Sequence, residues 1–182
     1  DAKNIIIISE KKNNVLFFLS KKLNLFHIEH KHYIGGRYSV LSEVGIVPAI
    51  MMGLNILNLR KNIRVFLKKN ELNFLRSSTL ILANILFQKK INNLILLNYS
   101  PELERFLFWV QQLISESLGK NGKGFLPVIS NVPKDHHSLL QLYLDGPKDK
   151  IFHIFSLEKN SQIKIFTKKI DQKISFLNNH KL

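Results

Sequence analysis

Two short, unbroken apolar runs do most to limit the fold of this chain. Ile5–Ser9 opens with four consecutive isoleucines, and Leu94–Asn98 reads LILLN. Runs of this length without polar alternation are typical of parallel strands that are buried on both faces. We therefore expect both runs to form buried strands of a parallel sheet.

The rest of the chain alternates between helical and strand patterns. A first helix is indicated by apolar residues at helical spacing, namely Val15, Leu16, Phe18, Leu19 and Leu23. Further helices are expected over residues 41–54, 56–68, 77–88, 101–118 and 135–145, and we expect the helix over 41–54 to be wholly buried. Further strands are expected over 26–30, 127–129 and 151–157, and a strand-helix pair from Ser161 on. Such alternation predicts an α/β fold with a mostly parallel, doubly wound sheet, in which ligands bind beyond the carboxyl ends of the strands.

Composition narrows the classes of function. The 182 residues contain no cysteine, which excludes a disulfide framework and a cysteine-based metal site. No apolar run approaches the roughly 18–20 residues of a membrane span, so we expect a cytoplasmic protein with no membrane partner. The net charge of +14 would suit a nucleic-acid binder. However, the lysines are dispersed and no aromatic stacking motif lies among them, so we expect a solvated surface and no nucleic-acid partner.

A glycine pair at residues 35 and 36 begins the segment GGRYSVLSEVG. Without Cβ atoms the backbone there can turn tightly or lie close to a ligand. Arg37 follows at once, and its permanently charged guanidinium suits an anionic or developing oxyanion group. The alternative interpretation is a surface turn that carries a solvated arginine.

A carboxylate and an amide share one face of the helix predicted over 101–118. Gln112 and Glu116 are four residues apart, and Gly119 then marks the end of the helix. Spacing alone leaves open whether Glu116 is a solvated side chain beside a glycine cap or a reactive group.

Five of the seven histidines occur in two groups, and neither group predicts a metal site. The first group is His27, His30 and His32. In an extended segment only the last two would point the same way, and two imidazoles alone make a poor site. Asp135, His136 and His137 resemble a phosphoesterase motif, but that metal chemistry also needs an upstream Asp-x-Asp cluster. The only aspartate before Asp135 is Asp1.

Three segments, taken in order, resemble the glucose-6-phosphate isomerase family. They are residues 35–45 (GGRYSVLSEVG), 112–120 (QLISESLGK) and 135–143 (DHHSLLQLY). The resemblance implies that Glu116 is the catalytic base, that Gln112 and Gly36 bind substrate, and that Arg37 stabilises the enediolate. In the third segment the family's helix opens with a catalytic histidine in the form His-x-x-x-Gln-Leu. His137 matches that register, with His136 as the alternative.

The resemblance also implies a fold and a reaction. The fold is the three-layer α/β sandwich of the sugar-isomerase (SIS) type. The reaction interconverts glucose 6-phosphate and fructose 6-phosphate through a cis-enediol, in glycolysis and gluconeogenesis, without a metal or other cofactor. The family's active site is completed in a homodimer, where the histidine comes from the neighbouring subunit. The alternative is an SIS-type phosphosugar-binding domain without catalysis, in which a base would have no use.

Two functional parts of that family have no match in this sequence. They are a Ser/Thr-rich phosphate-binding loop that precedes the aligned region and a C-terminal helix with a catalytic lysine. The resemblance thus assigns residues 1–35 to the end of a first SIS domain and residues 36–182 to a second that lacks its catalytic helix. We expect little or no turnover from the 182-residue chain alone.

Overall fold

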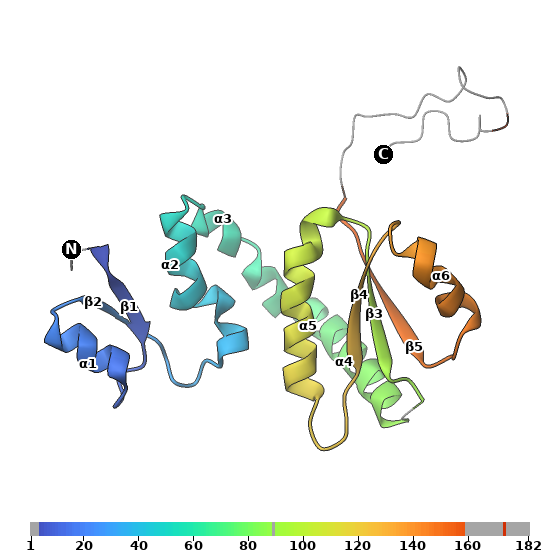
Figure 1. The fold of residues 1–182 in the computed structure, drawn as a ribbon, viewed down its shortest axis with the longest axis horizontal. Helices are drawn as coiled ribbons and strands as arrows, with labels where there is room; N and C mark the ends of the chain where they lie inside the picture. Colours follow the sequence, from blue (N-terminus) through green and yellow to red (C-terminus); the bar gives the residue numbers. More distant parts are fainter. Residues whose placement is uncertain (1–3, 89, 159–172, 174–182) are drawn as a thin grey trace.

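The strands of the computed structural model form two separate parallel sheets, one of two strands and one of three (Figure 1). The structure describes residues 4–88, 90–158 and 173. Every strand pairing among them is parallel. The α/β class with parallel strands is therefore confirmed, whereas the element pair predicted from Ser161 on falls almost wholly outside the described residues.

The first sheet is a small βαβ unit. It comprises β1 (Ile6–Ser9), α1 (Val15–Lys22) and β2 (Phe26–Glu29). The side chain of Asn14 caps α1 by accepting a hydrogen bond of 2.8 Å from the backbone N–H of Phe17. The expectation that β1 is buried on both faces is wrong, because Ile7 is buried while Ile6 is 41% exposed. In the described structure β1 pairs with β2 alone and packs against one helix, so much of its surface stays open.

A block of short helices follows the first sheet. It consists of η2 (Gly36–Leu41), a 3-10 helix, then α2 (Glu43–Met51), α3 (Ile56–Arg60) and the 3-10 helix η3 (Ile63–Leu67). The predicted continuous helix over 41–54 is therefore wrong at its start, and the one over 56–68 is divided in two. Hydroxyls explain the tight first turn, since Ser39 Oγ donates to the Gly36 carbonyl at 2.7 Å and Ser42 Oγ to the Ser39 carbonyl at 2.8 Å.

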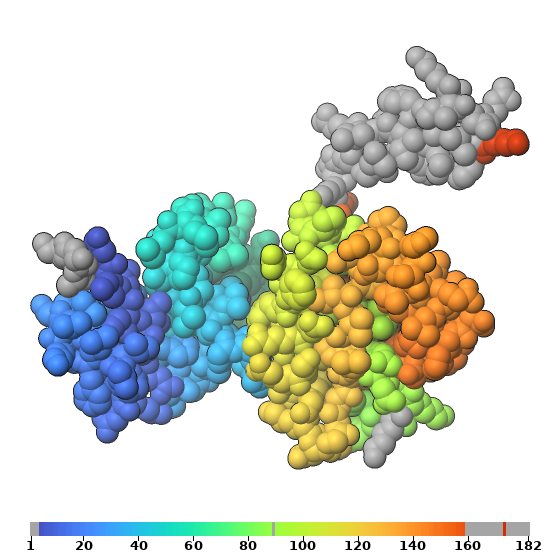
Figure 2. Space-filling model, in the orientation of Figure 1, coloured from blue at the N-terminus to red at the C-terminus, as the bar shows by residue number. Residues whose placement is uncertain are grey.

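The burial predicted for the 41–54 helix is also wrong. Ala49 is the one residue of α2 that is buried, and Met51 is 74% exposed. The apolar composition of α2 was a poor guide because this helix packs mainly against η2 and α3 instead of entering a sheet core. Figure 2 shows this block beside the first sheet and next to α5.

The second sheet has the strand order β4-β3-β5. Its elements are α4 (Lys69–Phe87), β3 (Asn93–Asn98), the 3-10 turn η4 (Pro101–Leu103), α5 (Glu104–Leu118), β4 (Leu126–Asn131), α6 (His136–Asp145) and β5 (Lys150–Phe155). Helices α4 and α5 cover one face of this sheet and α6 the other, which gives three layers (Figure 1). Helix α4 begins eight residues earlier than the 77–88 pattern predicts.

The core lies between the second sheet and the helix pair α4 and α5. Leu94 and Leu96 of β3 pack there with Leu107 of α5 and with Phe125. From Leu94 to Asn98 every residue of β3 is buried, as expected for a central parallel strand with neighbours on both sides. The prediction of a buried strand from the LILLN run is confirmed.

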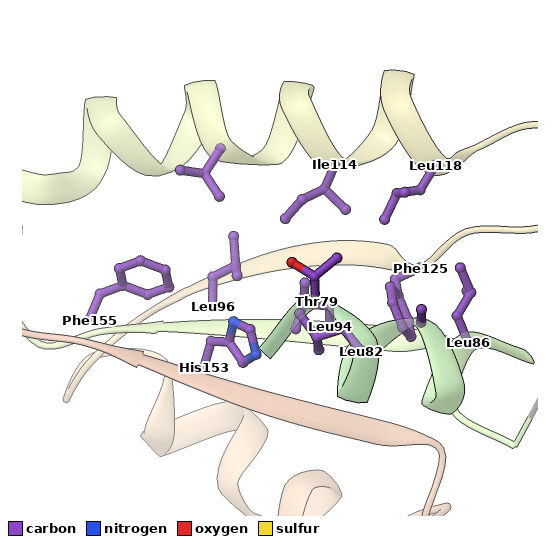
Figure 3. A pocket seen from close by; sticks show the side chains of 12 residues that line it. Thr79, Leu82, Leu86, Leu94, Leu96, Ile114, Leu118, Phe125, His153 and Phe155 are labelled. Atoms are coloured by element: carbon purple, nitrogen blue, oxygen red, sulfur yellow. The ribbon is translucent and has the colours of Figure 1, made fainter. Parts of the chain in front are cut away.

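A cavity of about 240 Å³ remains within this layer (Figure 3). Leucine, isoleucine, valine and phenylalanine side chains from α4, α5 and the sheet make up most of its wall. Thr79 and His153 are the polar members of the lining. Specific ligand sites place several convergent polar groups in an apolar pocket. This cavity has too few of them, and the sequence-predicted site residues do not line it.

Among the described residues, no helix combines the length and the apolar character that crossing a membrane requires.

Candidate active site

The first turn of η2 meets the last turn of α5, and this contact joins two of the sequence-predicted site residues. Arg37 Nη1 donates to Glu116 Oε2 at 3.3 Å, and Arg37 Nε donates to Ser117 Oγ at 3.0 Å. The other carboxylate oxygen, Oε1, accepts from Gln112 Nε2 at 2.9 Å. The structure thus brings Arg37, Gln112 and Glu116 together, although 79 residues separate the arginine from the glutamate.

The position of η2 on α5 is fixed by a backbone contact. The indole N–H of Trp109 donates to the carbonyl oxygen of Arg37 at 2.8 Å. Trp109, Gln112 and Glu116 follow one another at helical spacing and so form a single stripe on α5. The opposite side of the helix carries Leu107 into the sheet core. One amphipathic helix therefore anchors itself on the sheet and presents polar groups to η2.

Tyr38 completes the contact between the two helices. Its hydroxyl lies 2.8 Å from Ser117 Oγ, and the guanidinium of Arg37 lies 4.8 Å from the centre of its ring. The hydrogen bond to Ser117, together with the neighbouring Arg37 and Lys120, lowers the pKa of the Tyr38 phenol. The pKa of the Arg37 guanidinium is raised, chiefly by the adjacent Tyr38 and then by Glu116. The site is thus a local concentration of positive charge around one carboxylate.

The site is open to solvent. The side chain of Arg37 is 23% exposed and that of Glu116 is 48% exposed. Their pairing is therefore a contact that a charged ligand can reach and rearrange.

The glycine pair is not needed for a strained turn. Gly35 has φ of −65°, an angle open to any residue, and neither glycine has a positive φ. A Cβ on Gly36 would meet nothing within 4 Å, whereas one on Gly35 would make ordinary contact with Tyr38. The chain does turn here, since the Tyr38 N–H donates to the Gly35 carbonyl at 2.9 Å, but this turn does not require glycine. The structure instead leaves open space above Gly36.

The two adjacent histidines open α6 and differ in their surroundings. The ring of His136 packs edge-on against Tyr99, with ring centres 6.2 Å apart. His137 is exposed, and its side chain makes no hydrogen bond within the described residues. Its ring is therefore accessible to another molecule.

Glu116 and His137 lie at opposite edges of the second sheet. Helix α5 follows β3 and runs back to the start of β4, which brings Glu116 to the amino edge, whereas α6 begins beyond the carboxyl edge (Figure 1). The six residues of β4 between these edges span about 17 Å. The loop after β2 and His137 thus lie at carboxyl ends of strands, where ligands of parallel sheets commonly bind, and Glu116 does not.

Two histidines of the first group, His27 and His30, make hydrogen bonds within the first sheet and the segment that follows it. His30 hydrogen-bonds through Nδ1 to a carboxylate oxygen of Glu43 and lies 3.0 Å through Nε2 from the Ile34 carbonyl oxygen. His27 Nε2 lies 3.0 Å from Ser9 Oγ. In the part of the chain that the structure describes, no three residues of ligand type gather closely enough to hold a metal ion.

Sequence reasoning missed Trp109, Ser117 and Tyr38 as members of this site. A signal for Trp109 was available, since the single tryptophan of the chain stands seven residues before Glu116, two turns along the same helix face. Nothing in the sequence alone pairs Ser117 with Arg37 and Tyr38, because that contact depends on how η2 docks.

Several curated proteins named as glucose-6-phosphate isomerases are similar to this chain. A "Probable glucose-6-phosphate isomerase" of Methanococcus maripaludis is 33% identical over 84% of this chain and 36% of its own length. The "Glucose-6-phosphate isomerase" of Mycoplasmopsis pulmonis is 32% identical over 97% of this chain and 42% of its own. That of Methanocaldococcus jannaschii is 37% identical over 69% of this chain and 32% of its own. The chain spans between about a third and two fifths of these curated relatives.

Among solved structures, a hypothetical protein from Thermus thermophilus is similar over the whole of this chain and 45% of its own. The TM-score is 0.78 and the sequence identity is 25%. The sequence profile of the family described as phosphoglucose isomerase matches residues 1–125, which is more than half of the chain. On that match, the chain belongs to the phosphoglucose isomerase family.

Proposed function

We propose that this chain provides the proton-transfer half of an aldose-ketose isomerase site that interconverts glucose 6-phosphate and fructose 6-phosphate. The observation that carries the proposal is the contact of Arg37 with Glu116, flanked by Gln112. These are the residues that the family motifs single out, and the fold brings them together from separate elements. The names of the relatives support the same reaction, which belongs to glycolysis and gluconeogenesis.

Glu116 acts as the base. Its carboxylate accepts a proton from the carbon next to the substrate carbonyl. The electrons of that C–H bond form a new C=C bond and the carbonyl π electrons move onto the carbonyl oxygen, which gives a cis-enediolate. The carboxylic acid then returns its proton to the former carbonyl carbon, while the hydroxyl proton of the adjacent carbon passes to the first oxygen and leaves the new carbonyl, so no proton or electron is gained or lost overall. Gln112 holds Oε1 at 2.9 Å and so orients the carboxylate for both transfers.

Arg37 stabilises the negative charge that develops on the enediol oxygen. A single Nη1 hydrogen bond of 3.3 Å occupies the guanidinium on the Glu116 side. An open site allows the substrate to accept from the remaining N–H groups. The open space above Gly36 is where the sugar approaches the backbone.

His137 assists ring opening in the site of a neighbouring subunit. Two observations support this assignment over a role beside its own Glu116. His137 is exposed at the start of α6, and it lies at the far edge of the sheet from Glu116. In the homodimer that we propose, each site combines Glu116 and Arg37 of one chain with His137 of the other.

The family's phosphate-binding loop has no match in residues 1–182, so we propose that the substrate phosphate is bound outside these residues. We propose that residues 1–35 end a first SIS domain and that residues 36–182 form most of a second. The two separate sheets, which lie before and after residue 36, support this division. The non-catalytic phosphosugar-binding alternative is disfavoured because it leaves the arrangement around Glu116 without a purpose.

The test is Glu116→Gln in the full-length natural protein. The amide keeps the size of the side chain and its contact with Arg37 but cannot accept a proton from carbon. We expect fructose 6-phosphate conversion to fall by at least about 10²–10⁴, with binding of the sugar phosphate nearly unchanged. Glu71→Gln, an exposed change in the first turn of α4, is the matched control. Unchanged turnover in the Glu116 variant would remove this residue from the mechanism.

A second measurement uses the 182-residue chain by itself. We expect little or no turnover, because the phosphate-binding loop and the catalytic lysine of the family have no match in it. Robust activity of this chain would show that the proton-transfer half suffices.

A further inference from the structure

Arg37 lies along α5, because the two ends of this residue contact the helix about two turns apart. Its carbonyl oxygen accepts a hydrogen bond of 2.8 Å from the indole N–H of Trp109. Its guanidinium donates to Glu116 at 3.3 Å and to Ser117 at 3.0 Å. The step from Trp109 to Glu116 corresponds to about 10 Å along the helix axis. The height at which the Arg37 backbone sits on α5 therefore decides what its guanidinium can reach.

The contact with Trp109 is the one that fixes this height. Among the described residues, the other hydrogen bonds between η2 and α5 join side chain to side chain, and the Trp109 bond alone holds the backbone of η2. An arginine has many rotamers, so its guanidinium can keep side-chain contacts while its backbone shifts. A hydrogen bond to the main-chain carbonyl does not permit that shift.

Trp109 is itself attached to the second sheet. Its ring packs edge-on against Phe106, with ring centres 5.8 Å apart, and Phe106 packs in the same way against Phe155 of β5, at 6.4 Å. Phe155 in turn packs against the core cluster. The Trp109 side chain is half-buried, and two torsion angles alone set the position of its indole. A stiff aromatic connection thus runs from the core to the Arg37 carbonyl.

The Trp109 bond also differs from the others in what substrate does to it. In the proposed reaction the enediolate oxygen accepts from N–H groups of Arg37, so the contacts of the guanidinium with Glu116 and Ser117 can rearrange. The carbonyl oxygen of Arg37 takes no part in that exchange, because it is an acceptor and an anion requires donors. The hold on the Arg37 backbone can therefore persist through the reaction.

We propose that Trp109 is a positioning residue, whose indole N–H holds the Arg37 backbone at the height where the guanidinium meets the enediolate oxygen beside Glu116. This inference rests on the proposed isomerase function. It adds to that function a residue that touches neither substrate nor the reacting atoms. Because Arg37 acts on charge that develops in the transition state, a displaced guanidinium lowers kcat and leaves KM little changed.

The sharpest test removes the N–H and keeps the ring. In the full-length natural protein, Trp109 is replaced by benzothienylalanine, in which a sulfur atom stands where the indole has its N–H. Trp109→Phe is the simpler companion variant. We expect kcat to fall about tenfold or more in both, since a displacement of about 1 Å can cost about 10²-fold in rate. Phe108→Leu, a change at an exposed neighbour on α5, is the matched control and should leave kcat unchanged.

A double-mutant cycle separates positioning from a structural role. Arg37→Met removes the guanidinium and keeps much of the apolar stem. If Trp109 acts through that guanidinium, Trp109→Phe should lower kcat in the wild type and lower it no further in the Arg37→Met background. A residue that only stabilises the fold would cause the same fractional loss in both backgrounds.

The outcomes distinguish this inference from the function beneath it. Wild-type kcat in the benzothienylalanine protein would overturn the positioning role, and so would an equal loss in both backgrounds of the cycle. A rise in KM at unchanged kcat would overturn it as well, because the N–H would then serve binding alone. In each of these cases the proposed function stands if Glu116→Gln is inactive. If Glu116→Gln retains full activity, the proposed function itself fails first.

Discussion

The ion pair of Arg37 and Glu116 contributes little to the stability of the fold. Both side chains are partly exposed, and solvent and salt screen pairs of this kind. A contact of this kind costs little to rearrange when a charged ligand arrives. The position of the Arg37–Glu116 pair therefore matters more for ligand chemistry than for folding. The more buried pair of His30 and Glu43 matters more for folding.

His30 and Glu43 form a pH-sensitive contact at the junction between the first sheet and α2. Both ring nitrogens of His30 face acceptors, the Glu43 carboxylate and the Ile34 carbonyl, so the doubly protonated imidazolium fits this place. The hydrogen bond to Glu43 is the main reason that the pKa of His30 is raised above 6.5. The pKa of Glu43 is lowered below 4.5, first by its own backbone N–H and then by His30.

We expect the stability difference between wild type and His30→Gln to depend on pH. A raised histidine pKa contributes stability that is complete below 6.5 and is lost as pH rises through the folded-state value. A lowered glutamate pKa contributes stability that is present above 4.5 and is lost as pH falls through its folded-state value. The difference in Tm should therefore be largest between these limits and shrink toward pH 9.

His32→Gln is the matched control for this measurement. His32 is an exposed neighbour whose ring contacts Tyr33, and the described structure gives it no carboxylate partner. We expect its Tm to follow the wild type across the whole pH range. A constant Tm difference for His30→Gln from pH 5 to 9 would contradict the charged contact.

At the scale of elements, the junction of η2 and α2 decides where Arg37 lies. Gly45 sits in the first turns of α2, where a Cβ would lie 1.9 Å from the Val40 carbonyl oxygen and 2.7 Å from its carbon. Only a residue without a side chain allows α2 to pack this closely on the end of η2. Arg37 begins η2, so the glycine acts on the site through the backbone.

We expect Gly45→Ala to destabilise the protein by about 1–3 kcal/mol and to lower isomerase activity by displacing η2. Gly36→Ala is the informative comparison, because nothing lies within 4 Å of the Cβ that it adds. It should leave the unfolding free energy unchanged while weakening substrate binding, since it fills the proposed approach of the sugar. Urea unfolding and KM measured on both variants check this pair. Equal stability of the two would show that the backbone at Gly45 yields without cost.

Sequence patterns predicted an element and its burial correctly where the residue pattern of the segment agrees with the position of the segment in the fold. The LILLN run forms the central strand β3, which is buried as predicted. The apolar segment 41–54 also looked like a core element, but the hydroxyls of Ser39 and Ser42 hold its first residue in η2, and packing beside α3 leaves Met51 exposed. Burial depends on which elements lie next to a segment, and a single sequence does not specify that.

The same limit applies to the candidate site. Residues 112 and 116 could be placed together from helical spacing alone, and the resemblance added Arg37. The contacts of Ser117 and Trp109 with the Arg37 region could not be predicted, because they exist only after η2 docks on α5. Helical spacing also gave no position for Glu116 relative to the sheet, and the returning helix carries its last turn to the amino edge.

At the scale of the whole molecule, each block of the described chain exposes large apolar side chains. Val15 of α1 is 81% exposed, Leu57 of α3 is 83% exposed and Ile154 of β5 is 68% exposed. Large apolar side chains in solvent on several elements are the kind of residue that an interface with another protein surface covers. Together with the separation of Glu116 from His137, they support the proposal that the site is completed by further protein, including a second subunit.

Complementation between two inactive variants tests the shared site. In a dimer that joins one Glu116→Gln subunit to one His137→Ala subunit, one site receives both changes and the other receives neither. Random mixing makes half of the molecules such hybrids, each with one intact site of two, so activity should recover to about a quarter of the wild-type value. Each single variant assayed by itself should remain inactive. A double variant with both changes, mixed with either single variant, should recover no activity. If each site instead used both residues of a single chain, every site in the hybrid would carry one change, and mixing would restore nothing.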